Sequence, residues 1–420
     1  MMRKTKIVCT LGPATDDPEV LKALMNAGMN VGRINFSHGN YQDQEERINV
    51  FKWIRGELGL PIPLLLDTQG PEIRIGKFKD DKKVLLEKGA TFTLLNADEL
   101  GDETKVSITY KELYKDVSVG KTILINDGTI ELKVKEIADK DIVCEVIQGG
   151  YLTNRKSINV PDLVLNLPSI TEKDIADIKY GITAGFDYIA ASFVRKPEDV
   201  LAIKEVLKQN NGEHIKVISK IENREGIDNF DKILEVSDGI MVARGDLGVE
   251  IPMEQVPIYQ KQFIKKTYKQ GKPVITATQM LESMITNSKP TRAEVSDIAN
   301  AIYDGSSAIM LSGETATGNY PIECVKTMND VAVTIEDSLK YWKRFKNREY
   351  NLENLDYKFN MNFSVCTLAA NIKAKAIIAY TNTGDTSRML SSFGPECPIF
   401  AITENEITYR QLGAAWNITP

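Results

Sequence analysis

Residues 240–278 read IMVARGDLGVEIPMEQVPIYQKQFIKKTYKQGKPVITAT and hold two apolar runs with a helical segment between them. The runs IMVA (240–243) and VITAT (274–278) have the length of strands, whereas EQVPIYQKQFIKKTYKQG (254–271) has the length and apolar spacing of a helix. Runs that are apolar throughout are typical of parallel strands covered on both faces. This stretch therefore predicts two parallel strands joined by a crossover helix.

The same pattern recurs along the chain with different residues each time. Helical stretches such as PEVLKALMNAG (18–28) lie between the apolar runs. The eight runs that we expect to be strands are KIVCT (6–10), NVGRI (30–34), LLLD (64–67), YIAAS (188–192), VISK (217–220), IMVA (240–243), VITAT (274–278) and AIMLS (308–312). Eight strands that alternate with helices predict a fold built from parallel βαβ units.

An inserted all-β module is expected at residues 71–167. The third and fourth runs are about 120 residues apart, and KTILINDGTIELKVKEIADKDIVCEV (121–146) alternates polar and apolar residues around Asp127-Gly128, a typical hairpin turn. Without these 97 residues, 241 of the first 338 are left, close to the ~250 of a (β/α)₈ barrel. We therefore predict an α/β protein whose (β/α)₈ TIM barrel is formed by residues 1–70 and 168–338.

A smaller α/β unit is predicted at residues 339–420. A helix is expected over 321–342, and the polar stretch WKRFKNREYNLENLDYK (342–358) is typical of a linker. The segments FSVCTLAANIKAKAIIAYTNTG (363–384) and PIFAIT (398–403) then predict two strands with their helices. Two strands make a thin sheet, so we expect an incomplete, apparently truncated domain.

The composition narrows the class of protein. A chain of 420 residues, 42% hydrophobic and 26% charged, is typical of a soluble protein of two to three domains. Its net charge of −6 disfavours nucleic acid or an anionic membrane as a partner, and neither a signal peptide nor a membrane span is predicted. Five scattered cysteines without a CxxC pair indicate reduced thiols in the cytoplasm, and two histidines (His38 and His214) disfavour a histidine metal site.

Polar residues follow the predicted strands, where barrels of this kind carry their working groups. They are Arg33, Asn35, Ser37, His38, Asp67, Thr68, Ser192, Arg195, Lys220, Glu222, Arg244, Asp246, Thr278, Gln279, Ser312 and Glu314. Glu222 and Asp246 end neighbouring strands and supply the oxygen ligands that a hard divalent cation prefers. Lys220, two residues before Glu222 on the same strand face, would meet an anionic substrate held by that cation. Phosphoryl transfer needs these parts.

Each of these residues also has a purely structural explanation. Lys220 and Glu222 form the kind of pair that is usually a solvent-exposed ion pair of little energetic value. Asp246 and Thr278 are both residue types that begin helices as N-caps. What favours a site is the shared position of these residues at the ends of several strands of one barrel.

The chain resembles the pyruvate kinase family from Lys4 to its end. The segments that carry the resemblance are TLGPAT (10–15), GRINFSHG (32–39), LLDTQGPEIR (65–74), SKIENREG (219–226), DGIMVARGDLG (238–248), ITATQMLESM (275–284) and PTRAEVSDIANAIYDGSSAIMLSGETA (290–316). The resemblance implies a barrel A domain, a small β-barrel B domain that acts as a lid, and a C-terminal regulatory domain. It also implies phosphoryl transfer from phosphoenolpyruvate to ADP, giving pyruvate and ATP.

The resemblance also implies roles for individual residues. Glu222 and Asp246 correspond to ligands of Mg²⁺ (or Mn²⁺), and Lys220 to the ammonium that stabilises the phosphoryl group in transit. Thr278 and the amides of Gly245 and Asp246 correspond to the groups that bind the substrate carboxylate, with Thr278 on the side where enolpyruvate is protonated. The remaining matches are Arg33 to the substrate phosphate, Asn35, Ser37, Asp67 and Thr68 to K⁺, and Arg74, Lys156 and His38 to the nucleotide.

The C-terminal unit is expected to carry regulation and assembly. Its loop of Thr381, Asn382, Thr383, Gly384, Asp385 and Thr386 resembles one that cradles an effector phosphate, although a plain turn after a strand explains it equally well. The resemblance implies a cytoplasmic homotetramer, with a dimer as the alternative. It leaves open the effector, the strictness of the K⁺ requirement and whether the chain is naturally short.

Two other functions fit parts of the pattern. A Mg²⁺-dependent aldolase that acts through a pyruvate enolate would use Glu222 and Asp246, but it has no use for the β insert, Arg74 or Lys156. A non-enzymatic scaffold would have lost functional residues at the strand ends, and every matched position here carries a competent one. For the kinase, we expect Lys220→Met to abolish turnover and leave the melting temperature nearly unchanged.

Overall fold

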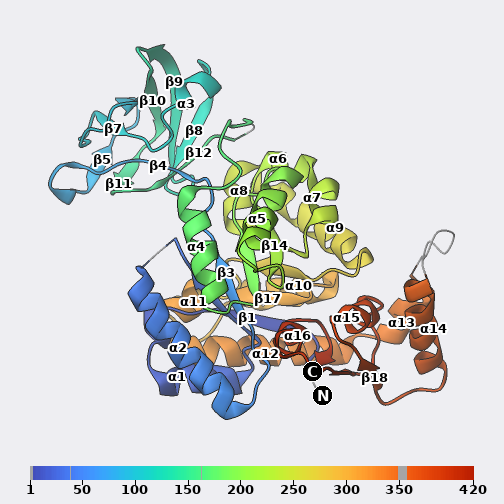
Figure 1. Ribbon diagram of the computed structural model, residues 1–420. Coiled ribbons are helices and arrows are strands. Elements are labelled where there is room, and N and C mark those ends of the chain that lie inside the picture. The colour runs from blue at the N-terminus through green and yellow to red at the C-terminus, as the bar shows by residue number, and fades with distance from the viewer. Residues whose placement is uncertain (1–2, 38, 162, 349–356) are drawn as a thin grey trace.

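The structure, a computed structural model, describes residues 3–37, 39–161, 163–348 and 357–420. Eight parallel strands close into a barrel in the order β1-β17-β16-β15-β14-β13-β3-β2 (Figure 1). They are β1 (Lys6–Thr10), β2 (Val31–Asn35), β3 (Leu64–Asp67), β13 (Tyr188–Ala191), β14 (Lys216–Ile221), β15 (Gly239–Ala243), β16 (Val274–Ala277) and β17 (Ala308–Leu311). Each predicted run overlaps one of these strands, which confirms the predicted barrel.

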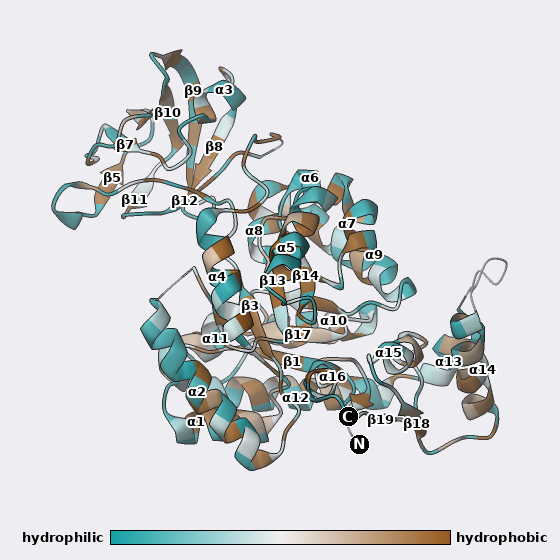
Figure 2. Cartoon of the chain, viewed as in Figure 1, coloured by the Kyte–Doolittle hydropathy of each residue, from teal (hydrophilic) through white to brown (hydrophobic). Residues whose placement is uncertain are grey.

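Helices surround this barrel and cover the outer face of its strands. They are α1 (Pro18–Ala27), α2 (Tyr41–Leu58), α4 (Glu172–Thr183), α5 (Pro197–Gln209), α6 (Arg224–Asp228), α7 (Phe230–Val236), α8 (Arg244–Glu250), α9 (Val256–Lys269), α10 (Arg292–Asp304), α11 (Gly313–Ala316) and α12 (Pro321–Ser338). One apolar cluster packs these helices on the strands, and a second, which includes Leu65, Ile218 and Met241, fills the barrel interior. Apolar contacts on both faces explain the continuous apolar runs, drawn brown in Figure 2.

Local sequence sets where these helices begin and end. The α10 helix starts with a capping box, in which Thr291 Oγ1 accepts from the Glu294 amide and Glu294 Oε2 accepts from the Thr291 amide. It ends at Gly305, whose φ of 103° suits a residue without a side chain. These ends fix where β17 starts, three residues later.

The insert forms an all-β unit that stands on the carboxyl-terminal side of the barrel (Figure 1). Its elements are β4 (Ile73–Arg74), β5 (Val84–Leu86), β6 (Thr91–Leu95), β7 (Lys105–Ser107), α3 (Leu113–Asp116), β8 (Thr122–Ile125), β9 (Ile130–Ala138), β10 (Asp141–Gln148), β11 (Gly150–Leu152) and β12 (Ser157–Asn159). Seven strands form one sheet, and an isolated bridge between Ile75 and Ile108 joins its two edge regions. The sheet therefore curls into a small barrel around its own apolar core.

The C-terminal unit lies near the amino-terminal end of the barrel. Its elements are α13 (Tyr341–Lys346), α14 (Tyr357–Asn371), β18 (Ile377–Tyr380), α15 (Asp385–Ser392), β19 (Ile399–Ile402), α16 (Glu406–Leu412) and β20 (Ile418–Thr419). Two sequence predictions were wrong here. The expected linker begins as helix α13, because Tyr341 and Phe345 share one face and are buried, and the short β20 adds a third parallel strand.

The domain boundaries at 70/71, 167/168 and 338/339 stay predictions.

All five cysteines are free and buried. Among the described residues, no helix combines the length and the apolar character that crossing a membrane requires.

Candidate active site

Lys220, near the end of β14, is the centre of a buried polar network at the barrel mouth. Its Nζ lies 3.1 Å from Asp67 Oδ1, 3.0 Å from Glu222 Oε1 and 2.8 Å from Ser192 Oγ. Burial lowers the pKa of Lys220, but the charges of Asp67 and Glu222 outweigh it and raise the pKa above its ordinary value. The ammonium therefore stays charged and is held in place from three strands.

Arg33 on β2 is fixed by the next strand of the barrel. Its Nε donates to Asp67 Oδ2 at 2.7 Å, and its Nη1 donates to Thr10 Oγ1 at 2.8 Å. Burial raises the pKa of Asp67, but the charges of Arg33 and Lys220 outweigh this and hold it below the ordinary value. One ionised carboxylate thus positions the two cations assigned to the substrate phosphoryl group.

Glu222 has an environment that suits a metal ligand. The side chain is fully buried, and its Oε2 accepts from the Phe193 amide at 2.5 Å. Its Oε1 lies 3.0 Å from Lys220 Nζ in an ion pair. Burial raises the pKa of Glu222, Lys220 opposes this, and the nearby charge of Asp246 raises it further. A cation between Glu222 and Asp246 would offset both effects, so this pair fits a divalent metal.

Thr278 lies directly after β16 in a strained conformation. Its φ is +69°, a left-handed value that is rare for a β-branched residue and typical of functional sites. Its Oγ1 accepts from the Gly245 amide at 2.7 Å and donates to the Ala277 carbonyl at 2.6 Å. Arg244 Nη2 donates to the Thr278 carbonyl at 2.6 Å and so stabilises this turn.

Asp246 and Thr278 do not begin helices as N-caps. Asp246 lies within the first turn of α8, whose N-cap is Ala243, and Thr278 precedes no described helix directly. Both line a cavity of about 640 Å³ between the barrel mouth and the tip of the inserted unit at Leu124, Asp127 and Gly128. This cavity is large enough for a substrate of several functional groups.

The four residues assigned to K⁺ belong to neighbouring strands. Asn35 and Asp67 are paired in register between β2 and β3. Asn35 Oδ1 accepts from the Ser37 amide at 3.0 Å, and Thr68 Oγ1 accepts from the Ser192 amide at 3.1 Å. The set contains only oxygen ligands, which suits a hard monovalent cation.

The residues assigned to the nucleotide lie on the inserted unit. Arg74 on β4 donates from Nε to Glu72 Oε2 at 2.8 Å and from Nη1 to the Arg155 carbonyl at 2.9 Å. Lys156 follows Arg155, so both cations lie on the paired strands β4 and β12 or next to them. His38 lies outside the described residues.

The comparison with known proteins decides the family. A model of the pyruvate kinase barrel domain matches residues 2–325, and one of the pyruvate kinase alpha/beta domain matches residues 361–420. The chain belongs to the pyruvate kinase family. It is 50% identical over 420 residues to the pyruvate kinase of Clostridium acetobutylicum, which covers the whole chain and 88% of that protein. It is also 50% identical to those of Staphylococcus haemolyticus and Bacillus licheniformis, covering 72% and 71% of them.

Membership of the pyruvate kinase family makes the chain an enzyme that transfers phosphate and works with a metal ion. No group of three or more His, Cys, Asp or Glu side chains that could hold a metal occurs in the part of the chain that the structure describes. Two carboxylates are sufficient for Mg²⁺, because this ion usually binds one or two of them and completes its shell with water and substrate phosphate.

Residues 381–386 lie far from the barrel mouth, where 381–384 connect β18 to α15 and 385–386 begin that helix (Figure 1). Thr381 Oγ1 accepts from the Gly384 amide at 2.9 Å, and Thr408 Oγ1 donates to the Asn382 carbonyl at 2.8 Å. Gly384 has a φ of +84° and precedes the first residue of α15. The loop is therefore an ordered turn held by a hydrogen bond of its own and by one from α16.

Sequence reasoning gave no role to three residues of the site. Ser192 binds Lys220, Thr10 binds Arg33, and Arg244 supports Thr278. Each lies at or directly after the end of a barrel strand, so its position was predictable. Its partner was not, because the partner lies on another strand.

Proposed function

We propose that this chain transfers the phosphoryl group of phosphoenolpyruvate to ADP, giving pyruvate and ATP, at the carboxyl-terminal mouth of the barrel. One observation carries this proposal: two buried cations, Lys220 and Arg33, bind the same carboxylate, that of Asp67. Ser192 and Glu222 also hold the Lys220 ammonium in place. Both substrates carry several negative charges, and like charges about 4 Å apart repel by about 4 kcal/mol at an effective dielectric constant near 20. Arg33 and Lys220 offset this repulsion.

Glu222 and Asp246 would hold Mg²⁺ (or Mn²⁺), and Asn35, Ser37, Asp67 and Thr68 would hold K⁺. When bound, these cations supply positive charge that neutralises the phosphates and the enolate oxygen. The effect of the Asp246 charge on the buried Glu222 carboxyl, which shows that the two carboxylates lie near one another, supports the first assignment. The paired positions of Asn35 and Asp67 support the second.

The first turn of α8 and Thr278 would bind the organic part of the substrate. The amides of Gly245 and Asp246 would bind the substrate carboxylate, for which the Gly245 amide would exchange its hydrogen bond to Thr278 Oγ1. Thr278 Oγ1, which donates its proton to the Ala277 carbonyl in this structure, would pass that proton to the methylene carbon of the enolate, directly or through a water, and would regain one from solvent as pyruvate forms. Arg74, Lys156 and His38 would bind the phosphates of ADP as the inserted unit closes on the cavity, which excludes water from the phosphoryl group.

The chain's setting completes the proposal. Five buried free cysteines support a reducing, cytoplasmic location, and the net charge of −6 supports small-molecule partners rather than nucleic acid or a membrane. We expect a homotetramer, with a dimer as the alternative result of a sedimentation measurement. The loop Thr381–Thr386 is the candidate effector site, and protection of its amides from exchange by a sugar phosphate would test it.

The decisive test measures pyruvate release from phosphoenolpyruvate with Mg²⁺ and K⁺. A phosphotransferase releases pyruvate only when ADP is present and forms one ATP for each pyruvate. An aldolase does not cleave a phosphate ester, so neither it nor a non-enzymatic scaffold would release pyruvate from phosphoenolpyruvate. Release that does not depend on ADP, or none at all, would overturn the proposal.

A further inference from the structure

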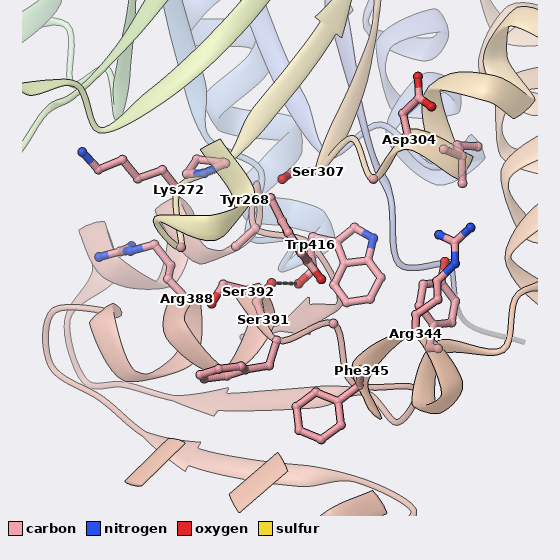
Figure 3. A pocket seen from close by; sticks show the side chains of 18 of the residues that line it. Tyr268, Lys272, Asp304, Ser307, Arg344, Phe345, Arg388, Ser391, Ser392 and Trp416 are labelled. Atoms are coloured by element: carbon pink, nitrogen blue, oxygen red, sulfur yellow. Dashed lines mark hydrogen bonds between the residues drawn. The ribbon is translucent and has the colours of Figure 1, made fainter. Parts of the chain in front are cut away.

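A second cavity, of about 130 Å³, lies at the opposite end of the barrel, against the C-terminal unit (Figure 3). A single water needs only about 10–15 Å³ on this scale, so the cavity has room for a small organic molecule. Pro273 and Ser307, which precede β16 and β17, line it on the barrel side. Ser391, Ser392 and Trp416 line it on the other.

Aromatic rings form much of the cavity wall. They belong to Tyr188, Tyr268, Tyr341, Phe345, Phe393 and Trp416. The rings of Tyr341 and Trp416 lie 5.4 Å apart, and Figure 3 shows the Trp416 indole between the Ser391–Ser392 pair and Arg344. No hydrogen bond of the indole N–H is found within the described ranges. Faces of this kind favour a planar, apolar group.

The cavity lining is also strongly cationic. Four cationic residues line the cavity together with one carboxylate, that of Asp304; the cations are Lys272, Arg344, Arg348 and Arg388. Asp304 is already neutralised, because it accepts from Gln260 Nε2 at 3.0 Å and forms an ion pair with Lys261, which does not line the cavity. An anion entering the cavity would therefore meet a lining with more cationic residues than carboxylates.

These cations differ in how firmly they are already held. Lys272 Nζ donates to the carbonyls of Leu234 and Glu235, and Arg388 is paired with Asp385. Arg348 Nη1 donates to the Ser392 carbonyl at 2.9 Å. Arg344 is exposed, and its guanidinium makes a long hydrogen bond of 3.3 Å to the Tyr303 carbonyl. Arg344 is thus the cation best able to turn towards a ligand.

We propose that this cavity binds a small anion with a planar ring, either an aromatic carboxylate or an aryl phosphate monoester. The ring would lie among the aromatic side chains and the anionic group would pair with Arg344. This site is separate from the substrate cavity at the barrel mouth, with which it shares no lining residue. A ligand here would bridge the barrel and the C-terminal unit.

Tryptophan fluorescence of the full chain gives a direct test, since Trp416 is one of only three tryptophans. The probes are benzoate and phenyl phosphate, with benzyl alcohol as a ring without charge and inorganic phosphate as a charge without a ring. We expect a saturable signal for at least one aromatic anion, with affinity about tenfold above both controls. No saturable signal from either aromatic anion would overturn the proposal, and their relative affinity identifies the preferred anionic group.

Two variants on α13 locate the binding site. Arg344→Gln removes the proposed partner and should weaken binding about tenfold. Lys343→Gln makes the same charge change one residue away, outside the cavity lining, and should bind as the wild type does. If Arg344→Gln binds like the wild type, or if both variants lose affinity equally, the ligand lies elsewhere and the inference is wrong. The test needs no turnover, so it does not depend on the proposed kinase activity.

Discussion

Lys220 Nζ lies 3.0 Å from Glu222 Oε1 in a buried ion pair. Glu222 follows β14 directly, and both side chains turn into the barrel mouth. Three strand ends contribute to the network, because Asp67 of β3 and Ser192 after β13 bind the same ammonium. This network is the reason that the strand-end charges belong to one site.

Replacement of Lys220 by Met should lower kcat by at least about 10³, because it removes a preorganised cation from the phosphoryl path. Steady-state pyruvate release measures this loss. From the sequence, we expected Lys220→Met to leave the melting temperature nearly unchanged, and the structure changes this expectation. Breaking a buried ion pair costs about 3–5 kcal/mol, since Glu222 and Asp67 would be left without their common partner. The melting temperature should therefore fall.

Lys216→Met is the matched control, because Lys216 begins the same strand and is only partly buried. It should leave kcat unchanged and the melting temperature nearly so. Wild-type turnover in Lys220→Met would show that this ammonium takes no part in the reaction.

Asp246→Asn should raise the Mg²⁺ concentration needed for half-maximal activity by about tenfold or more, since an amide is a weaker ligand than a carboxylate. The measurement is a Mg²⁺ titration of the rate, together with the Mg²⁺-induced rise in melting temperature with phosphoenolpyruvate present. Glu254→Gln, an exposed change after α8, should behave like the wild type. Identical titrations for all three proteins would remove Asp246 from the metal site.

Thr278→Ala should slow the protonation of enolpyruvate by about 10²-fold, because it removes the Oγ1 hydroxyl. Exchange of the pyruvate methyl protons with deuterated water, followed by NMR, isolates this step from phosphoryl transfer. Thr278→Ser keeps the hydroxyl and the bond from the Gly245 amide, so it should retain most of the exchange. Equal rates in the two variants would show that the hydroxyl is not the proton donor.

The sequence was sufficient to predict the eight strands and the charged residues at their ends. Apolar runs covered on both faces make strands easy to find, and barrel geometry brings their carboxyl ends together. The contact between Lys220 and Asp67 could not be predicted in the same way, because it joins residues 153 positions apart, across the inserted unit. It depends on β13 lying between β3 and β14.

Side-chain partners and backbone strain were also beyond the sequence. Nothing in the residues around Thr278 predicts a left-handed φ, which is imposed by Arg244 and Gly245 from the neighbouring strand's loop. The helix α13 was missed because its cationic residues resemble a linker. Its buried Tyr341 and Phe345 pack against Trp416 and Phe363, which lie in other parts of the fold.

Asn159 should control closure of the inserted unit. Its Nδ2 donates to Glu250 Oε1 at 2.8 Å, which links β12 to α8 of the barrel. Asn159→Asp places two carboxylates in contact, so the unit should open and kcat should fall several-fold. Adding Glu250→Gln restores a donor and should recover most of the rate. Kinetics of the single and double variants test this, and a double variant no faster than Asn159→Asp would contradict the link.

Lys6 should make the stability of the fold rise with pH above pH 7. Burial and the charge of Arg3 lower the pKa of Lys6 from 10.5 to about 7, and the charge of Glu336 opposes this. Above pH 7, Lys6 is therefore neutral in the native state. In the unfolded chain, Lys6 keeps its proton up to about pH 10.5. The unfolded state binds more protons in this window, so stability rises with pH by about 1.4 kcal/mol per unit. Lys6→Met loses this dependence, and its melting temperature should exceed that of the wild type most near pH 7 and progressively less towards pH 9. Lys22→Met, at an exposed lysine, should show a constant difference. A constant difference for Lys6→Met as well would mean that native Lys6 stays charged throughout.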